Sequence, residues 1–231
     1  MTGFFRFPHI AHLAWQGSSA PRDDKVLGQD QADALLAGEV VVEEKLDGAN
    51  LGIAFSASGE LRVQNRGEYL RAPFAGQFQR LPEWLVAHQD GLFDALGGEL
   101  IAFGEWCAAR HSLDYSQLPD WCLLFDVYDR RAKRFWSSAR RNAWAGEAGL
   151  QVVRQIDRGR FSVAALLRLV DRERSTYRDG PIEGVVVRRE SEEWLIDRAK
   201  LVRADFSQSI TEHWRRQPLR WNRVISMANE T

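Results

Sequence analysis

The segment from Val40 to Asn50 constrains the fold of this 231-residue chain more than any other. It reads Val-Val-Val-Glu-Glu-Lys-Leu-Asp-Gly-Ala-Asn, and a second apolar run ending at Phe55 follows directly. β-Branched runs on both sides of Asp-Gly predict two strands joined by a tight turn as a hairpin. Lys45 would then stand at a strand end, where desolvation or nearby positive charge can turn its amine into a nucleophile. A solvated lysine in an ordinary hairpin explains the same local pattern, so the function depends on what the rest of the chain places nearby.

Composition narrows the class of protein. Hydrophobic residues make up 45% of the chain and charged residues 27%, which is typical of a globular domain with a substantial core. The net charge of −1 means that a nucleic acid would have to bind through a local basic surface. No apolar run approaches the roughly 20 residues of a membrane span, and the N-terminus lacks the pattern of a signal peptide. We therefore expect a cytoplasmic protein that binds no membrane, with Cys107 and Cys122 as reduced thiols.

Four later segments predict strands that carry a chemically useful side chain. A carboxylate inside an apolar strand costs free energy unless it has a hydrogen-bonding or cationic partner. The planar guanidinium of an arginine at a strand end suits a phosphate, and an aromatic ring in a central strand either joins the core or stacks on a planar base. The four residues are Arg66 after residues 61–65, Glu105 within 99–106, Phe125 within 121–129, and Glu183 within 182–188.

Basic residues gather in two places. Arg198 and Lys200 are two apart in a predicted strand and so share a face, and two adjacent cations are most easily explained by an anion between them. A second group lies between Arg130 and Arg141 and is either a phosphate contact or the solvated face of a helix.

In chain order these residues resemble the motifs of the covalent nucleotidyltransferase superfamily, which contains polynucleotide ligases and capping enzymes. Lys45-Leu46-Asp47-Gly48 resembles the K-x-D-G motif, and Arg66-Gly67 is similar to the arginine element that follows it. Phe103-Gly104-Glu105-Trp106, Phe125-Asp126-Val127, Glu183-Gly184-Val185-Val186 and Arg198-Ala199-Lys200 resemble the later motifs in the same order. Asn50 extends the first motif to K-x-D-G-x-N, which resembles the ATP-dependent RNA ligase branch. The resemblance covers residues 40–206.

The resemblance implies a fold and a reaction. The fold would be an α+β nucleotidyltransferase domain, ATP-grasp-like in kind, with antiparallel sheets and flanking helices around a nucleotide cleft. One such domain would occupy residues 1–231, with a short basic tail over 207–231 and no separate C-terminal domain. Lys45 would attack the α-phosphate of ATP and keep AMP. The AMP would then pass to a 5′-phosphate end, and a 3′-hydroxyl would displace it to seal the strand, as in RNA repair.

The resemblance also implies a role for each residue. Glu183 and Asp47 would serve Mg²⁺ or Mn²⁺, Phe125 would stack on adenine, and Glu44 would line the base pocket through its backbone. Arg198 and Lys200 would contact the α-phosphate. The catalytic residues would be Lys45, Asp47, Arg66 and Lys200, and the nucleotide-binding residues Glu44, Lys45, Asn50, Arg66, Glu105, Phe125, Glu183, Arg198 and Lys200.

Two departures keep alternatives open. Arg198 stands where the family has lysine, and arginine binds phosphate but is effectively never a proton donor. The family usually carries a further C-terminal domain, so either the domain works alone or an accessory or end-healing protein supplies the missing part. The nearest rivals are an ATP-dependent DNA ligase and a ligase for nicks in hybrid duplexes. A capping guanylyltransferase, an NAD-using ligase and a catalytically inactive module that binds nucleotides or RNA ends are the others.

Overall fold

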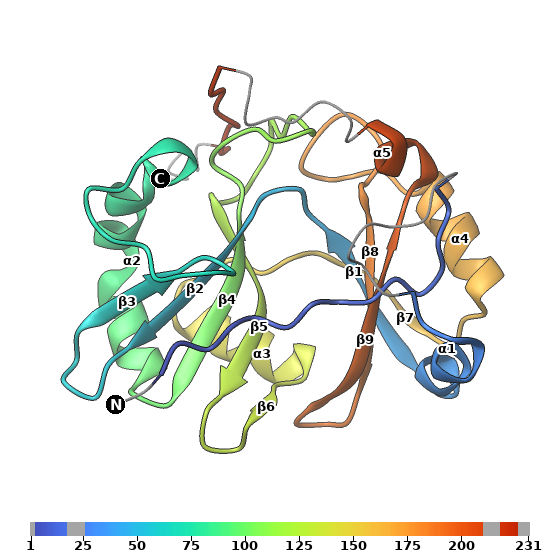
Figure 1. Ribbon diagram of the computed structural model, residues 1–231, viewed down its shortest axis with the longest axis horizontal. Coiled ribbons are helices and arrows are strands. Elements are labelled where there is room, and N and C mark those ends of the chain that lie inside the picture. The colour runs from blue at the N-terminus through green and yellow to red at the C-terminus, as the bar shows by residue number, and fades with distance from the viewer. Residues whose placement is uncertain (1–2, 18–25, 210–217, 226–231) are drawn as a thin grey trace, which may run out of the picture.

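The computed structural model describes residues 3–17, 26–209 and 218–225 and contains two antiparallel sheets that lie side by side (Figure 1). The first sheet has the order β7 (Gln155–Gly159), β1 (Val40–Lys45), β8 (Gly184–Glu190), β9 (Leu195–Val202). The second has the order β3 (Leu61–Gln64), β2 (Ala49–Phe55), β4 (Leu100–Trp106), β5 (Cys122–Asp129), β6 (Arg134–Phe135). The predicted α+β fold with antiparallel sheets is confirmed.

Helices cover the outer face of each sheet. α1 (Gln29–Leu36) and α4 (Val163–Arg172) pack on the first sheet, and α2 (Leu81–Leu96) and α3 (Ser138–Glu147) pack on the second. The remaining helical elements are η1 (Gly76–Phe78) and α5 (Ala204–Ser209). Figure 1 shows α2 at one end of the molecule and α1 with α4 at the other, with the two sheets between them.

Local sequence fixes the ends of these helices. Pro82 occupies the first turn of α2, where its missing N–H is not needed, and the helix ends at Gly97, whose φ of 53° favours glycine. The Ser162 side chain caps α4 by accepting a hydrogen bond from the Ala165 N–H at 3.2 Å. Such caps satisfy backbone groups that would otherwise lack partners at a helix end.

Strand alternation in the first sheet sorts apolar from charged residues. Val40 and Val42 of β1 join the core beneath α1 and α4, whereas Glu43 and Lys45 alternate with them onto the opposite face. The β8–β9 register pairs Arg188 with Arg198 and Val186 with Lys200, so these cations also share one face. The charged face is therefore the one that can line a polar site.

The predicted hairpin between β1 and β2 is wrong. β1 pairs with β7 and β8 in the first sheet, while β2 pairs with β3 and β4 in the second, so neither strand has a free edge for the other. Residues 46–48 instead carry the chain from one sheet to the other. The apolar patterns identified both strands correctly, but a pattern of side chains does not specify the pairing partner.

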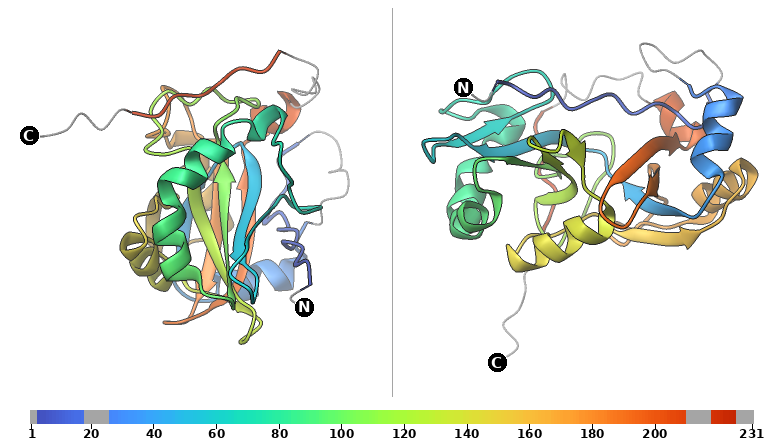
Figure 2. Two further views of the ribbon diagram at one scale, coloured as in Figure 1. Left: turned by 90° about the vertical axis from the view of Figure 1, so that its left-hand side faces the viewer. Right: turned by 90° about the horizontal axis from the view of Figure 1, so that it is seen from below.

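The N-terminal segment 3–17 ties the two sheets together (Figure 2). The Gln64 side chain of β3 donates to the Phe5 carbonyl at 2.7 Å, and the Leu13 N–H donates to the Lys200 carbonyl of β9 at 2.8 Å. Among the described residues, no helix combines the length and the apolarity that crossing a bilayer requires. Both cysteines are free thiols and buried.

Candidate active site

Lys45 ends β1 and lies against the start of β8. The β1–β8 register pairs Lys45 with Gly184, which brings the neighbouring Glu183 alongside. The Lys45 Nζ donates to Glu183 Oε1 at 2.6 Å, and the two side chains are 26% and 5% exposed. A Cβ on Gly184 would lie 2.2 Å from the Leu201 carbonyl oxygen, so only glycine fits between β1 and β9 here. The Lys45 side chain is thus partly exposed, whereas its carboxylate partner is enclosed.

The crossing at Gly48 brings the second sheet to the same place. The Gly48 N–H donates to Glu105 Oε1 at 3.0 Å, and β2 pairs Asn50 with Glu105 across the sheet. A Cβ on Gly48 would lie 2.6 Å from the Trp106 carbonyl oxygen, which leaves room for glycine alone. The Lys-x-Asp-Gly sequence therefore places Lys45 of the first sheet near the Glu105 carboxylate of the second sheet.

These carboxylates hold Lys45 in its charged form. Burial alone would lower the pKa of Lys45, but the negative charges of Glu183, Glu105 and Asp47 outweigh burial and raise it. Burial raises the pKa of Glu105 to about 7 and that of Glu183 to about 8, with Lys45 opposing the rise and Asp47 adding to it. A nearby cation was expected to lower the pKa of Lys45. In the protein without ligands the nearest charges are negative and raise this pKa instead.

Asp47 is held by the loop that follows β4. Its Oδ2 accepts hydrogen bonds from the N–H groups of Ser112 and Leu113 at 2.7 and 2.8 Å, and its own N–H donates to the Tyr115 hydroxyl at 2.8 Å. The His111 Nδ1 lies 4.0 Å from Asp47 Oδ1. The carboxylate is thereby fixed next to the lysine, with Oδ1 turned toward His111.

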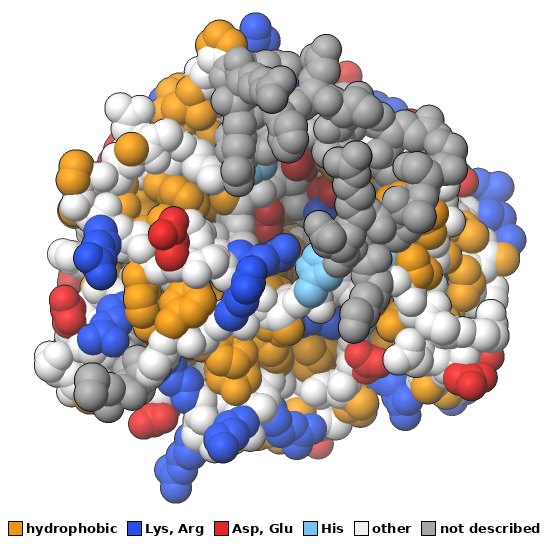
Figure 3. Space-filling view, viewed as in Figure 1, with side chains coloured by type: hydrophobic (Ala, Val, Ile, Leu, Met, Phe, Trp, Pro, Cys, Tyr) orange, Lys and Arg blue, Asp and Glu red, His pale blue; other side chains and the backbone are white. Residues whose placement is uncertain are grey.

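A cavity of about 570 Å³ opens over Lys45 and is lined by residues from both sheets. In Figure 3 this face is hollowed near its middle, where acidic, basic and histidine side chains meet. Phe7 and His9 of the N-terminal segment contribute to the wall. The predicted site residues that line the cavity are Glu44, Lys45, Asp47, Asn50, Arg66, Glu105, Phe125 and Lys200.

Polar groups in this region fit a bound polar ligand. The buried side-chain atoms without a hydrogen-bond partner in the described residues include three groups near the cavity: the Asn50 amide, Oε2 of Glu44 and Oε2 of Glu183. Buried polar atoms normally have partners, so these groups suit a bound ligand that supplies the missing hydrogen bonds. No set of three or more His, Cys, Asp or Glu side chains in the described residues is arranged to hold a metal. Mg²⁺ commonly takes one or two carboxylates together with water and substrate phosphates, and Glu183 Oε2 suits that mode.

Two predicted residues are paired with charged side chains that the sequence did not predict for the site. The Glu44 carboxylate lies 3.5 Å from the Arg154 guanidinium, and its backbone N–H donates to the Arg154 carbonyl. Arg198 does not line the cavity: its guanidinium is bound by the Asp126 carboxylate and packs over the rings of Phe7 and Phe135. Of the predicted cationic pair, Lys200 lines the cavity, whereas Arg198 packs against Phe7, which lines it.

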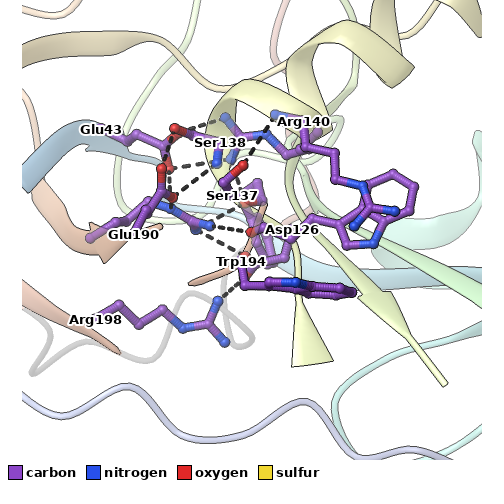
Figure 4. A network of polar contacts seen from close by, with 12 residues as sticks. Glu43, Asp126, Ser137, Ser138, Arg140, Glu190, Trp194 and Arg198 are labelled. Atoms are coloured by element: carbon purple, nitrogen blue, oxygen red, sulfur yellow. Dashed lines mark hydrogen bonds and ion pairs between the residues drawn. The ribbon is translucent and has the colours of Figure 1, made fainter. Parts of the chain in front are cut away.

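The partner of Arg198 belongs to a buried network that joins the two sheets (Figure 4). Asp126 of β5 also accepts from Arg188 of β8 at 2.9 Å, and Arg188 donates to Glu190 at 2.6 Å. Arg141 of α3 binds Glu43 of β1 at 2.5 Å. Three carboxylates thus meet three guanidiniums, and the charges balance. The network was not predicted, although a charged residue inside an apolar strand signals it at Glu43, Asp126 and Arg188.

The basic group at residues 130–141 also differs from expectation. Arg141 is fully buried in the network and is not available to a phosphate. Arg140 packs between the rings of Trp136 and Trp194, at 4.1 and 4.9 Å from their centres, and pairs with Glu193. Sequence clustering alone did not separate the buried arginine from the surface one.

Comparisons with known proteins agree with this geometry. The chain resembles a lysine-to-methionine variant of the Naegleria gruberi RNA ligase with AMP and Mn, with 15% identity and a TM-score of 0.59, over 78% of this chain and 54% of that one. An arginine-to-alanine variant of the same ligase with ATP and Mn matches with the same values. An archaeal ATP-dependent RNA ligase matches with 21% identity and a TM-score of 0.58, over 87% of this chain and 49% of that one.

These structures show a shared fold, and the chain spans about half of their length. A comparison of the sequence with curated proteins finds no match. The family model described as RNA ligase matches residues 38–202, well over half of the chain, and includes every strand that carries the site. The chain therefore belongs to the RNA ligase family.

Proposed function

We propose that the protein is an ATP-dependent RNA ligase that forms lysyl-AMP on Lys45 and seals 5′-phosphate to 3′-hydroxyl ends in RNA repair. The observation that carries this proposal is the position of Lys45. Its side chain lines a cavity large enough for a small ligand, and its amine is paired with the buried Glu183 carboxylate. Membership of the RNA ligase family supports it. The structures with ATP, AMP and Mn are those of the relatives and support the choice of ligands here.

The residues around Lys45 fit the charges of the first step. The amine must lose a proton before it attacks the α-phosphate, and Glu183, Glu105 and Asp47 oppose that loss. Glu183 and Asp47 would hold Mg²⁺ or Mn²⁺, which supplies positive charge that offsets these carboxylates and the phosphate oxygens. Lys200 lies in the cavity wall where it can neutralise the α-phosphate as the Lys45–phosphorus bond forms and pyrophosphate leaves.

The remaining residues would bind the nucleotide and the RNA end. Phe125 offers an aromatic face to adenine, and the unpartnered Asn50 amide suits a ribose or phosphate oxygen. Arg66 and Glu105 would hold the ribose or the end phosphate. The Arg198 guanidinium is bound by Asp126 and does not line the cavity, so we assign the α-phosphate contact to Lys200. A direct contact between Arg198 and the α-phosphate stays a prediction.

Labelling with ATP tests the proposal. Purified protein is mixed with Mg²⁺ or Mn²⁺ and ATP radiolabelled at the α-phosphate, and the product is separated on a denaturing gel. We expect a labelled band that Lys45→Ala and Lys45→Arg abolish. The control Lys133→Asn retains it, because Lys133 is an exposed turn residue with a φ of 55° that asparagine tolerates. An unlabelled wild type whose intact mass shows no bound AMP would overturn the proposal.

The same preparation separates the alternatives. Labelling by GTP or NAD in place of ATP would indicate a capping enzyme or an NAD-using ligase. Nicked RNA, DNA and hybrid duplexes distinguish an RNA ligase from a DNA ligase with the same chemistry. A catalytically inactive binding module would retain ATP without becoming labelled. We further propose that residues 1–231 act as one adenylation domain, and sealing that needs an added protein would identify an accessory partner.

A further inference from the structure

The segment 218–225 packs back along the loop that follows β4, and we call this segment the C-terminal strap (Figure 2, red). The Arg110 N–H donates to the Arg220 carbonyl at 2.8 Å, and the Leu118 N–H donates to the Arg223 carbonyl at 3.1 Å. Trp221 adds a side-chain anchor, because the Arg80 guanidinium lies 4.5 Å from the centre of its ring. The strap is therefore attached along its length to residues 108–118.

Asn222 is the polar centre of the strap. It is 3% exposed. Its Nδ2 donates to the Cys107 carbonyl at 2.7 Å and to the Ala109 carbonyl at 3.3 Å, and its Oδ1 accepts from the Tyr115 N–H at 2.9 Å. One buried amide thus fixes both ends of the loop, at residues 107–109 and at residue 115. Removing it would leave several buried backbone groups without partners.

The loop in turn holds the segment that contains the nucleophile. Tyr115 is 1% exposed and accepts from the Asp47 N–H, while Ser112 and Leu113 donate to the Asp47 carboxylate. Leu46 packs in the same apolar cluster as Tyr115. Both residues that follow Lys45 are therefore positioned by a loop that Asn222 anchors.

We propose that Asn222 is a positioning residue for Lys45, acting through Tyr115 and Asp47. The inference rests on the proposed function, since it assigns the strap a part in lysine adenylylation. A displacement of about 1 Å at a reacting atom can cost roughly a hundredfold in rate. Loss of Asn222 should therefore slow the attack of Lys45 on ATP far more than it weakens ATP binding.

The test compares three variants of the full chain below their unfolding temperatures. Asn222→Ala removes the anchor, and Tyr115→Phe removes only the hydroxyl that accepts from Asp47. Asp120→Ala is the matched control: its carboxylate accepts from Trp84 and Trp121 but does not contact the loop at Asp47. The measurements are the single-turnover rate of label transfer at saturating ATP, the Kd for ATP, and amide hydrogen exchange at Ser112 and Leu113.

We expect Asn222→Ala and Tyr115→Phe to slow label transfer by about tenfold to a hundredfold, with the Kd for ATP changed much less. The double variant should be little slower than Asn222→Ala, because both changes break one chain of contacts. Exchange at Ser112 and Leu113 should accelerate in Asn222→Ala and not in Asp120→Ala.

A rate equal to that of Asp120→Ala, or additive losses in the double variant, would overturn the inference. If Asn222→Ala does not fold, the Tyr115→Phe variant decides: an unchanged rate of label transfer in that variant would refute the inference. An unlabelled wild type would instead overturn the proposed function, and the exchange measurement would still test the contacts.

Discussion

Asp126→Asn tests whether the buried network holds the two sheets together. Asp126 is 1% exposed and binds both Arg188 and Arg198. Asparagine keeps the shape but removes the charge, so two buried guanidiniums lose their shared counter-ion while Glu43 and Glu190 remain. Breaking one partner of a buried ion pair costs about 3–5 kcal/mol. For a chain of this length each kcal/mol lowers the melting temperature by roughly 2–4 °C, which predicts a fall of about 6–20 °C.

Equilibrium unfolding in urea, with a thermal scan beside it, measures the loss. Asp179→Asn is the control, because Asp179 forms an ion pair with Arg174 in which the side chains are 94% and 67% exposed, and exposed pairs contribute little. Adding Arg198→Met to Asp126→Asn should recover part of the stability by removing a cation that has lost its partner. A loss in Asp126→Asn below about 1 kcal/mol, or no recovery in the double variant, would show that the network does not stabilise the packing of the two sheets.

Three further predictions concern pH and backbone space. Without metal and ATP, the rate at which the Lys45 amine reacts with an acylating reagent should rise with pH through neutrality without a plateau near pH 7, because the carboxylates raise the pKa of Lys45 and only its neutral form attacks. The hydrogen bond with Asp120 raises the pKa of His88, so the stability it contributes is present below the usual histidine pKa and lost as pH rises through the folded-state value. His88→Gln should flatten that part of the melting-temperature profile. Gly48→Ala should cost about 1–3 kcal/mol in urea unfolding and abolish most labelling, because its Cβ would lie 2.6 Å from a backbone carbonyl.

Each of these predictions has a result that contradicts it. An acylation rate at Lys45 that is flat between about pH 6 and pH 9, roughly one unit either side of the pKa values of Glu105 and Glu183, would mean that Lys45 is already neutral. Equal slopes of melting temperature against pH in wild type and His88→Gln would remove the histidine as the cause. Full labelling in Gly48→Ala would show that the crossing tolerates a side chain.

The amino-acid patterns predict the strands and their chemically useful side chains but not the contacts between distant strands. Lys45, Glu105 and Glu183 were predicted as site residues from separate strand motifs, and the structure brings them together. Their meeting depends on the crossing at Gly48, which local patterns present as a hairpin turn. Pairing across sheets is set by which strand edges are free, and that is a property of the whole fold.

Arginine roles were the least predictable from sequence. Arg198 and Lys200 share a face as expected, yet only Lys200 lines the cavity, because Asp126 of another sheet binds Arg198. Arg141 looked like a surface cation and is fully buried. An arginine side chain can lie on the surface or in the interior. In the interior it needs a carboxylate partner, and here that partner is distant in the sequence.

The position of AMP on the chain decides whether Lys45 is the nucleophile. Wild type is incubated with ATP and Mg²⁺, digested at neutral pH, and its peptides are compared by mass spectrometry with those of Lys45→Ala. We expect one AMP, carried by the peptide that contains Lys45 and absent from the variant. AMP on Lys133 or Lys200 instead, or no AMP on a wild type shown to be free of it beforehand, would show that Lys45 is not the nucleophile.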